Sequence, residues 1–236
     1  MFIVSEQNYI LLQYLLIFIP IILSLIAQGM VDGAYKKGQM INSYNGKTGS
    51  EVAREMLINN GISDVEVRLT RGYLSDHYNP RNKTLNLSSE VYNGSDASSI
   101  AIAAHEVGHA IQHNQGYFML KLRSSMVGVT NFANNVSWVL IFVGLFLGLF
   151  DLLLIGVILF GVVALFQLVT LPVELNASRR AYQYLVDSYV IVSDEEKRGT
   201  KSVLRCAAFT YVVALITSIA QILRYVLMFA GRRRDD

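Results

Sequence analysis

Four apolar segments, each long enough to cross a lipid bilayer, restrict this chain to the folds of membrane proteins. They lie at about 9–30, 127–150, 152–171 and 207–230, and a helix needs about 20 mostly apolar residues to span the hydrocarbon core. Apolar residues make up 53% of the chain and charged residues only 16%, whereas a soluble domain carries about 25% charged residues. The sequence therefore predicts an α+β membrane protein, mainly α, with about four transmembrane helices and a short β-sheet.

The second and third segments share one apolar stretch from Val136 to Leu171, which is too long for a single crossing. Asp151 interrupts this stretch, and a lone carboxylate costs much less free energy at the head groups than at the bilayer centre. We therefore expect a tight turn at Phe150 and Asp151 between two antiparallel membrane helices.

Two polar regions, 31–125 and 172–205, lie outside the membrane, and four crossings place them on the same side. In the first region, Thr48 and Glu51 form a capping-box pair that begins a helix, and the turn-forming pair at 60–61 ends it. Further elements follow from apolar periodicity and turn residues: strands at 65–69 and 84–87, a turn at 79–80 between them, and a helix at about 97–114.

Lysine and arginine residues near the membrane favour its cytoplasmic side. The opposite side has mainly the cluster at 232–234, with Arg224 nearby. On the side of the polar regions lie Lys36, Lys37, Lys121, Arg123, Arg179, Arg180, Lys201 and Arg205. The bias predicts that the polar regions face the cytoplasm. A net charge of +2 gives no reason to expect nucleic acid as a partner, and the single cysteine, Cys206, excludes an intrachain disulfide.

Residues 105–109 read His-Glu-Val-Gly-His, and this motif indicates the chemistry of the chain. Histidines four residues apart lie on one face of a helix about one turn apart, so both can bind one zinc ion. Glu106 lies beside them and is placed to accept a proton from a water that the metal activates. The motif therefore predicts His105 and His109 as metal ligands and Glu106 as a general base.

A catalytic zinc site needs a third protein ligand. His113 continues the spacing of four, but eight residues of helix place it about 12 Å from His105, too far to share one ion. Glu174 is the stronger candidate, because it follows Pro172, which we expect to end the third membrane helix and begin a new one. On local sequence alone, Glu174 fits equally well as a solvated carboxylate at a helix N-terminus. Together with the histidine pair, its interpretation as a ligand is favoured.

Several polar residues are candidates for supporting roles around such a centre. Ala177 would let the glutamate helix approach the histidine helix closely, and Asn176 and Ser178 are small polar residues that could hydrogen-bond the ligands. A further donor should stabilise the oxyanion of a transition state. The candidates for these two roles are His77, Tyr78, Asn176, Ser178, Arg179 and Arg180. His77 fits an ordinary loop histidine at least as well.

Four stretches of the chain, 48–54, 74–81, 104–112 and 171–181, resemble the bacterial membrane zinc metallopeptidase family, which is YugP-like and also called neutral zinc metallopeptidase. The histidine motif with a downstream glutamate is similar to the gluzincin class. A membrane hairpin between the histidine helix and the glutamate helix also resembles HtpX-type membrane proteases. The resemblance implies a zinc cofactor, peptidase activity and a small zincin-like domain.

These interpretations divide the chain into five parts. The first is a retained membrane anchor, because its apolar run is longer than that of a signal peptide and no Lys/Arg-rich region precedes it. The expected parts are an N-terminal transmembrane helix at 1–30, a metallopeptidase domain at 31–125, a transmembrane hairpin at 126–171, a third-ligand helix at 172–205, and a C-terminal transmembrane helix with a basic tail at 206–236.

The expected function is that of a membrane-embedded zinc metalloendopeptidase. Because residues 109 and 174 lie close to predicted membrane boundaries, we expect membrane proteins or juxtamembrane peptides as substrates, with a role in quality control. The strand at 84–87 is either an edge strand that pairs with substrate or an internal strand without that role. The alternative function is a non-catalytic metal-binding scaffold, which would not need Glu106. A transporter is disfavoured because the membrane helices carry almost no charge.

Overall fold

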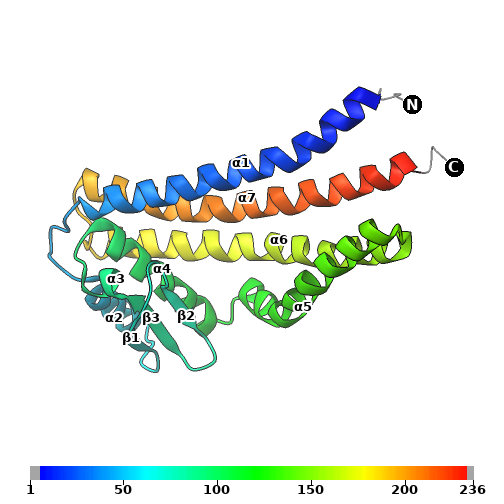
Figure 1. Ribbon diagram of the computed structural model, residues 1–236. Coiled ribbons are helices and arrows are strands. Elements are labelled where there is room, and N and C mark those ends of the chain that lie inside the picture. Colours follow the sequence, from blue (N-terminus) through cyan, green and yellow to red (C-terminus); the bar gives the residue numbers. More distant parts are fainter. Residues whose placement is uncertain (1–5, 233–236) are drawn as a thin grey trace. The chain divides into compact units, whose positions relative to one another are not determined.

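The computed structural model describes residues 6–232, and its largest elements are four long helices (Figure 1). By length and composition, each of them could cross a membrane. They are α1 (Glu6–Gln39), α5 (Phe118–Leu147), α6 (Phe150–Asp187) and α7 (Asp194–Arg232). The described chain forms two compact units, one made of 6–27, 122–170 and 210–232, the other of 28–121 and 171–209. The expected fold class, mainly helical with four candidate membrane spans and a small sheet, is confirmed.

In the first unit, α5 and α6 form the expected hairpin, and glycines bring their backbones together. A Cβ atom added to Gly144 would lie 2.7 Å from the backbone nitrogen of Leu153, and one added to Gly156 would lie 2.8 Å from Ile141 Cγ1. Such small residues at helix contacts are typical of membrane bundles, where close packing replaces the hydrophobic effect as the main source of association.

The turn of this hairpin lies slightly earlier than we expected. α5 ends at Leu147, Gly148 adopts a φ of 68°, and α6 begins at Phe150. Glycine takes this left-handed conformation without steric cost, which explains the position of the turn. Asp151 is therefore in the first turn of α6, where a carboxylate interacts favourably with the helix dipole.

Pro172 lies inside α6 and does not end it, so the expected boundary between a membrane helix and a separate ligand helix was wrong. Proline lacks an N–H and removes one hydrogen bond of the helix, but packing around a long helix can compensate for that loss. The apolar segment up to Leu171 and the residue Glu174 therefore belong to one continuous helix.

The second unit contains a three-stranded sheet in the order β1-β3-β2. Its strands are β1 (Glu66–Thr70), β2 (His77–Asn79) and β3 (Thr84–Ser88). β3 is central, because it pairs in parallel with β1 and antiparallel with β2. The interpretation of 84–87 as an edge strand was therefore wrong. The sequence did not reveal β2, because three residues before a turn are too few to show the alternation of a strand.

Helix α4 (Ala97–Asn114) carries the histidine motif and packs with α2 (Gly49–Asn59) and the short helix α3 (Ser89–Asn93). The capping box of Thr48 and Glu51 is present at the start of α2, and the side chain of Asp96 accepts hydrogen bonds from two backbone N–H groups at the start of α4. The core contains buried apolar side chains from five elements: Val52, Met56, Leu85, Leu87, Val91, Ile100, Val107 and Leu185. This core fixes the face of α4 on which the motif lies.

Candidate metal centre

The second unit brings His105, His109 and Glu174 together, as expected from the sequence. One ligand atom from each of the three residues lies within 4.8 Å of the other two. Oε2 of Glu174 lies 3.2 Å from Nε2 of His105 and 3.5 Å from Nε2 of His109. Two residues of α4 and one of α6 thus direct their ligand atoms to one point.

The two helices can approach this closely because Gly108 faces Ala177. A Cβ atom on Gly108 would lie 2.8 Å from the carbonyl oxygen of Ala177 and 3.1 Å from its Cα. Ala177 was expected to permit this approach, but Gly108, inside the motif itself, was not recognised as its counterpart. The glycine lets backbone meet backbone, which sets the separation between the histidines and Glu174.

Both histidines have a polar partner on the ring nitrogen that faces away from Glu174. Nδ1 of His105 lies 3.1 Å from Oγ of Ser178, and Nδ1 of His109 lies 3.0 Å from Oε1 of Gln112. Partners of this kind fix the orientation and tautomer of metal-binding histidines. Two imidazole nitrogens and one carboxylate oxygen form a donor set suited to zinc, so these residues fit that ion.

Gln112 connects α4 and α6, and the sequence did not point to it. Its side chain is fully buried and donates from Nε2 to the carbonyl oxygen of Val173 at 2.8 Å and to Oδ1 of Asn176 at 2.9 Å. Gln112 lies three residues after His109, so its helical spacing was the available signal. Asn176, expected near the ligands, therefore contacts His109 only through Gln112.

Glu106 lies beside the cluster and is held by the backbone of β2. Its Oε2 accepts a hydrogen bond of 3.0 Å from the N–H of Tyr78. Burial raises the pKa of the Glu106 carboxyl, and the nearby Glu174 carboxylate acts in the same direction, although the two histidines oppose the shift. A carboxylate whose pKa is raised accepts a proton more readily than an ordinary carboxylate, which suits a general base.

The histidine partners favour the ionised form of Glu174, the buried acid of the cluster. Burial opposes the ionisation of Glu174, but hydrogen bonds with His105 and His109 outweigh it and hold its pKa below the ordinary value. For His109, burial disfavours the charged ring, and the hydrogen bond with Glu174 more than compensates, so its pKa is raised. The centre therefore favours a negative charge on Glu174, as metal binding requires.

The remaining candidate residues, His77, Arg179 and Arg180, differ in how they are connected to the cluster of His105, His109 and Glu174. His77 is exposed, and its Nδ1 lies 2.8 Å from the carbonyl oxygen of Ser75. Arg179 is exposed on α6 and takes part in none of the hydrogen bonds described above. Arg180 donates from Nε to Oδ1 of Asn176 at 2.7 Å. The structure thus connects Arg180, rather than its neighbour, to the ligand network.

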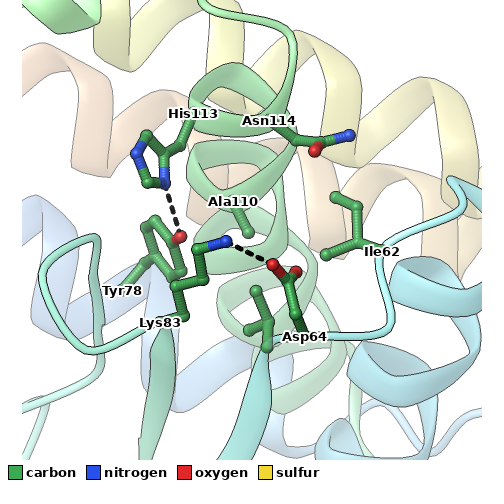
Figure 2. A pocket seen from close by; sticks show the side chains of 8 residues that line it. Ile62, Asp64, Tyr78, Lys83, Ala110, His113 and Asn114 are labelled. Carbon is green, nitrogen blue, oxygen red and sulfur yellow. Dashed lines mark hydrogen bonds and ion pairs between the residues drawn. The ribbon is translucent and has the colours of Figure 1, made fainter.

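His113 is not part of the cluster, which agrees with its rejection as a ligand. Figure 2 shows its ring beside Tyr78, whose hydroxyl lies 2.8 Å from His113 Nδ1. Both residues line a pocket of about 230 Å³ between α4 and the start of the sheet, together with the ion pair of Lys83 and Asp64 and four other residues. Tyr78 therefore contacts Glu106 through its backbone and this pocket through its side chain.

Comparison with known proteins gives the class to which this architecture belongs. Residues 13–230 match the model of a family described as "Putative neutral zinc metallopeptidase", and the chain belongs to that family. A similar protein is the "Putative membrane protease YugP" of Bacillus subtilis (strain 168), which is 43% identical over 214 residues. The match covers 91% of this chain and 95% of that protein. No solved structure matches the chain.

The comparisons confirm three expectations. The resemblance to membrane zinc metallopeptidases is confirmed by the family match and by the relative's sequence identity. Zinc is confirmed as the cofactor of the family, and the cluster of His105, His109 and Glu174 could hold a metal ion. The match to a membrane protease, with four helices able to span a bilayer, supports a membrane protein that acts as a protease.

Proposed function

We propose that the protein is a zinc endopeptidase whose metal ligands are His105, His109 and Glu174 and whose general base is Glu106. The observation that carries this proposal is the convergence of three possible ligand atoms within 4.8 Å of one another. A fourth residue, the acid Glu106, lies beside them and is held by the backbone N–H of Tyr78. A structural metal site would not need that acid, so a non-catalytic scaffold explains less of the geometry. The combination of two histidines and a glutamate from a second helix supports the gluzincin type.

The residues around the centre have distinct tasks in peptide hydrolysis. Zinc, when bound, would acidify a water and polarise the scissile carbonyl. Glu106 accepts the proton of that water on its carboxylate and passes it to the departing amine. Tyr78 holds Glu106 in place with a backbone N–H, while Ser178 and Gln112 orient the two histidine rings. Each partner thus restricts one side chain before substrate arrives.

Metal removal tests the core of the proposal. Purified full-length protein in detergent should contain about one zinc ion per chain, the number that a single three-ligand site binds. A chelator should abolish cleavage of an internally quenched peptide, and added zinc should restore it. Cleavage that persists after complete zinc removal would contradict the mechanism. Zinc binding without any cleavage of membrane-bound or soluble peptides would favour the scaffold.

We propose that the substrates are membrane proteins or juxtamembrane segments. Glu174 follows the apolar part of α6 by only three residues in one continuous helix, which is about 5 Å of helix rise. A peptide bond near the bilayer surface would therefore meet the centre without leaving the membrane environment. In cells that carry Glu106→Gln, we expect membrane proteins to accumulate, which quantitative proteomics would detect. A set dominated by soluble proteins would contradict a role in membrane-protein quality control.

We propose that the centre faces the cytoplasm, because most lysines and arginines near the membrane lie on its side. Arg81, an exposed residue of the second unit, offers a test. In a Cys206→Ala background, Arg81→Cys should resist a membrane-impermeant thiol reagent in intact cells and react after lysis. Reaction in intact cells would place the centre on the opposite side.

A further inference from the structure

A chain of polar side chains leads from the surface of α6 to the buried ring of His109. Arg180 donates from Nε to Oδ1 of Asn176 at 2.7 Å, and Gln112 donates from Nε2 to the same oxygen at 2.9 Å. Oε1 of Gln112 lies 3.0 Å from Nδ1 of His109. The chain thus has three hydrogen bonds in series: its first two members belong to α6, its last two belong to α4, and the bond between Asn176 and Gln112 joins the helices.

The orientation of this chain is set at its outer end. A guanidinium group has only donors, so the atom of Asn176 that faces Arg180 is the amide oxygen. A second bond of Arg180, from Nη1 to Oε1 of Gln115 at 2.8 Å, keeps the guanidinium in this position. The side-chain oxygen of Asn176 therefore has one charged donor and offers its other lone pair to Gln112.

The same reasoning fixes the amide of Gln112. Its side-chain NH₂ group has two acceptors, the oxygen of Asn176 and the backbone carbonyl oxygen of Val173 at 2.8 Å. If the amide were rotated by half a turn, its oxygen would face both acceptors in a fully buried place, and two hydrogen bonds would be lost. The amide oxygen of Gln112 consequently faces His109.

An amide oxygen can only accept, so Nδ1 of His109 carries the hydrogen of this bond. In the neutral form that metal binding requires, the ring has only this one protonated nitrogen, so the lone pair is on Nε2. Nε2 is the atom that lies 3.5 Å from Glu174 and takes part in the cluster. The polarity of the chain thus selects the one tautomer of His109 that can bind a metal at this point.

We propose that Arg180, Asn176 and Gln112 are positioning residues that set the tautomer and orientation of His109 for zinc. The inference rests on the proposed zinc ligation by His105, His109 and Glu174. Gln112 also bonds to the carbonyl of Val173, the residue before Glu174, so one side chain aligns ligands from both helices. Arg180 lies at the outer end of this series of hydrogen bonds, and because it can only donate, it determines the direction in which each bond of the series is donated.

The test is the zinc affinity of full-length protein in detergent, measured by competition with a chromophoric chelator at constant pH. Asn176→Leu and Arg180→Met should weaken zinc binding by about 10- to 100-fold, the usual effect of losing an indirect partner of a metal ligand. Asn176→Asp keeps two acceptor oxygens for Arg180 and Gln112 and should bind zinc nearly as tightly as the unchanged protein. Arg179→Met, which removes an adjacent exposed charge, is the matched control.

A second readout separates positioning from simple cross-linking of the helices. With cobalt in place of zinc, Asn176→Leu should alter the visible absorption of the metal, which reports ligand geometry, while Asn176→Asp should not. Lower thermal stability in Asn176→Leu with unchanged metal affinity and spectrum would overturn the inference. Equal losses in Asn176→Asp and Asn176→Leu would overturn it as well.

His105→Ala distinguishes this inference from the proposed function. If zinc binding survives His105→Ala, the proposed centre is wrong. If His105→Ala abolishes binding while Asn176→Leu and Arg180→Met leave it unchanged, the centre stands and only the role of the polar chain is refuted.

Discussion

Replacing Glu106 with glutamine should lower the rate of peptide hydrolysis by a factor of about 10² to 10⁴, the range typical of a lost general base. Glutamine has nearly the shape of glutamate, and its side-chain oxygen can still accept the N–H of Tyr78. The amide cannot take up a proton, however, so only the chemical step should suffer. We expect zinc content and thermal stability to stay close to those of the unchanged protein, and both should be measured with kcat/KM on a quenched peptide.

The exposed glutamate Glu66 provides the matched control, since its described partner is Arg68 on the same strand. Glu66→Gln should leave the cleavage rate unchanged. Equal cleavage by Glu106→Gln and the unchanged protein would refute the role of Glu106 as base. Loss of zinc together with activity in Glu106→Gln would instead show that Glu106 acts in metal binding.

The elements with strong local signals were predictable from the sequence. The helix of the histidine motif begins after Asp96 and ends near Gly116, and α2 has both halves of its capping box. These features depend on residues within one turn of each other, so one sequence is enough to reveal them. Because both histidines belong to one such helix, their juxtaposition followed directly from the spacing.

Features that depend on contacts between distant residues were not predictable in this way. A proline such as Pro172 usually indicates a helix boundary, yet α6 continues through it, since a helix supported by its neighbours can tolerate one missing hydrogen bond. Strand β2 is short and forms only by pairing with β3. Within α4, Gln112 contacts the ring of His109, but its hydrogen bonds with Val173 and Asn176 of α6 depend on residues that are distant in the sequence.

The position of Glu174 shows how the local sequence and the contacts between distant residues together decide the interpretation of one residue. Local sequence left this residue undecided between a metal ligand and a solvated carboxylate at a helix N-terminus. In the structure it is only 2% exposed, and it lies in the interior of α6, far from that helix's first residue. The second interpretation therefore has no structural basis, and the partners of this carboxylate include the two histidines.

Gly108→Ala should have the second large effect, because it adds one methyl group where two helix backbones meet. The added carbon would lie 2.8 Å from the carbonyl oxygen of Ala177, so α4 and α6 would have to move apart. Overpacking of this kind costs about 1–3 kcal/mol of folding free energy. Since Glu174 and the histidines lie on opposite sides of this contact, zinc affinity should fall by more than tenfold, the effect of about 1.4 kcal/mol.

The direction of the stability change in Gly108→Ala distinguishes an effect of packing from an effect of helix propensity. Alanine is favoured over glycine within a helix by about 1 kcal/mol, so an unobstructed site should become more stable. Gly33 in α1 is such a site, because nothing lies within 4 Å of its added Cβ. Gly33→Ala should therefore retain zinc affinity and unfold at the same or a higher temperature. If Gly108→Ala behaves like Gly33→Ala, the histidines and Glu174 do not need this helix contact to meet, and the two helices must be joined in another way.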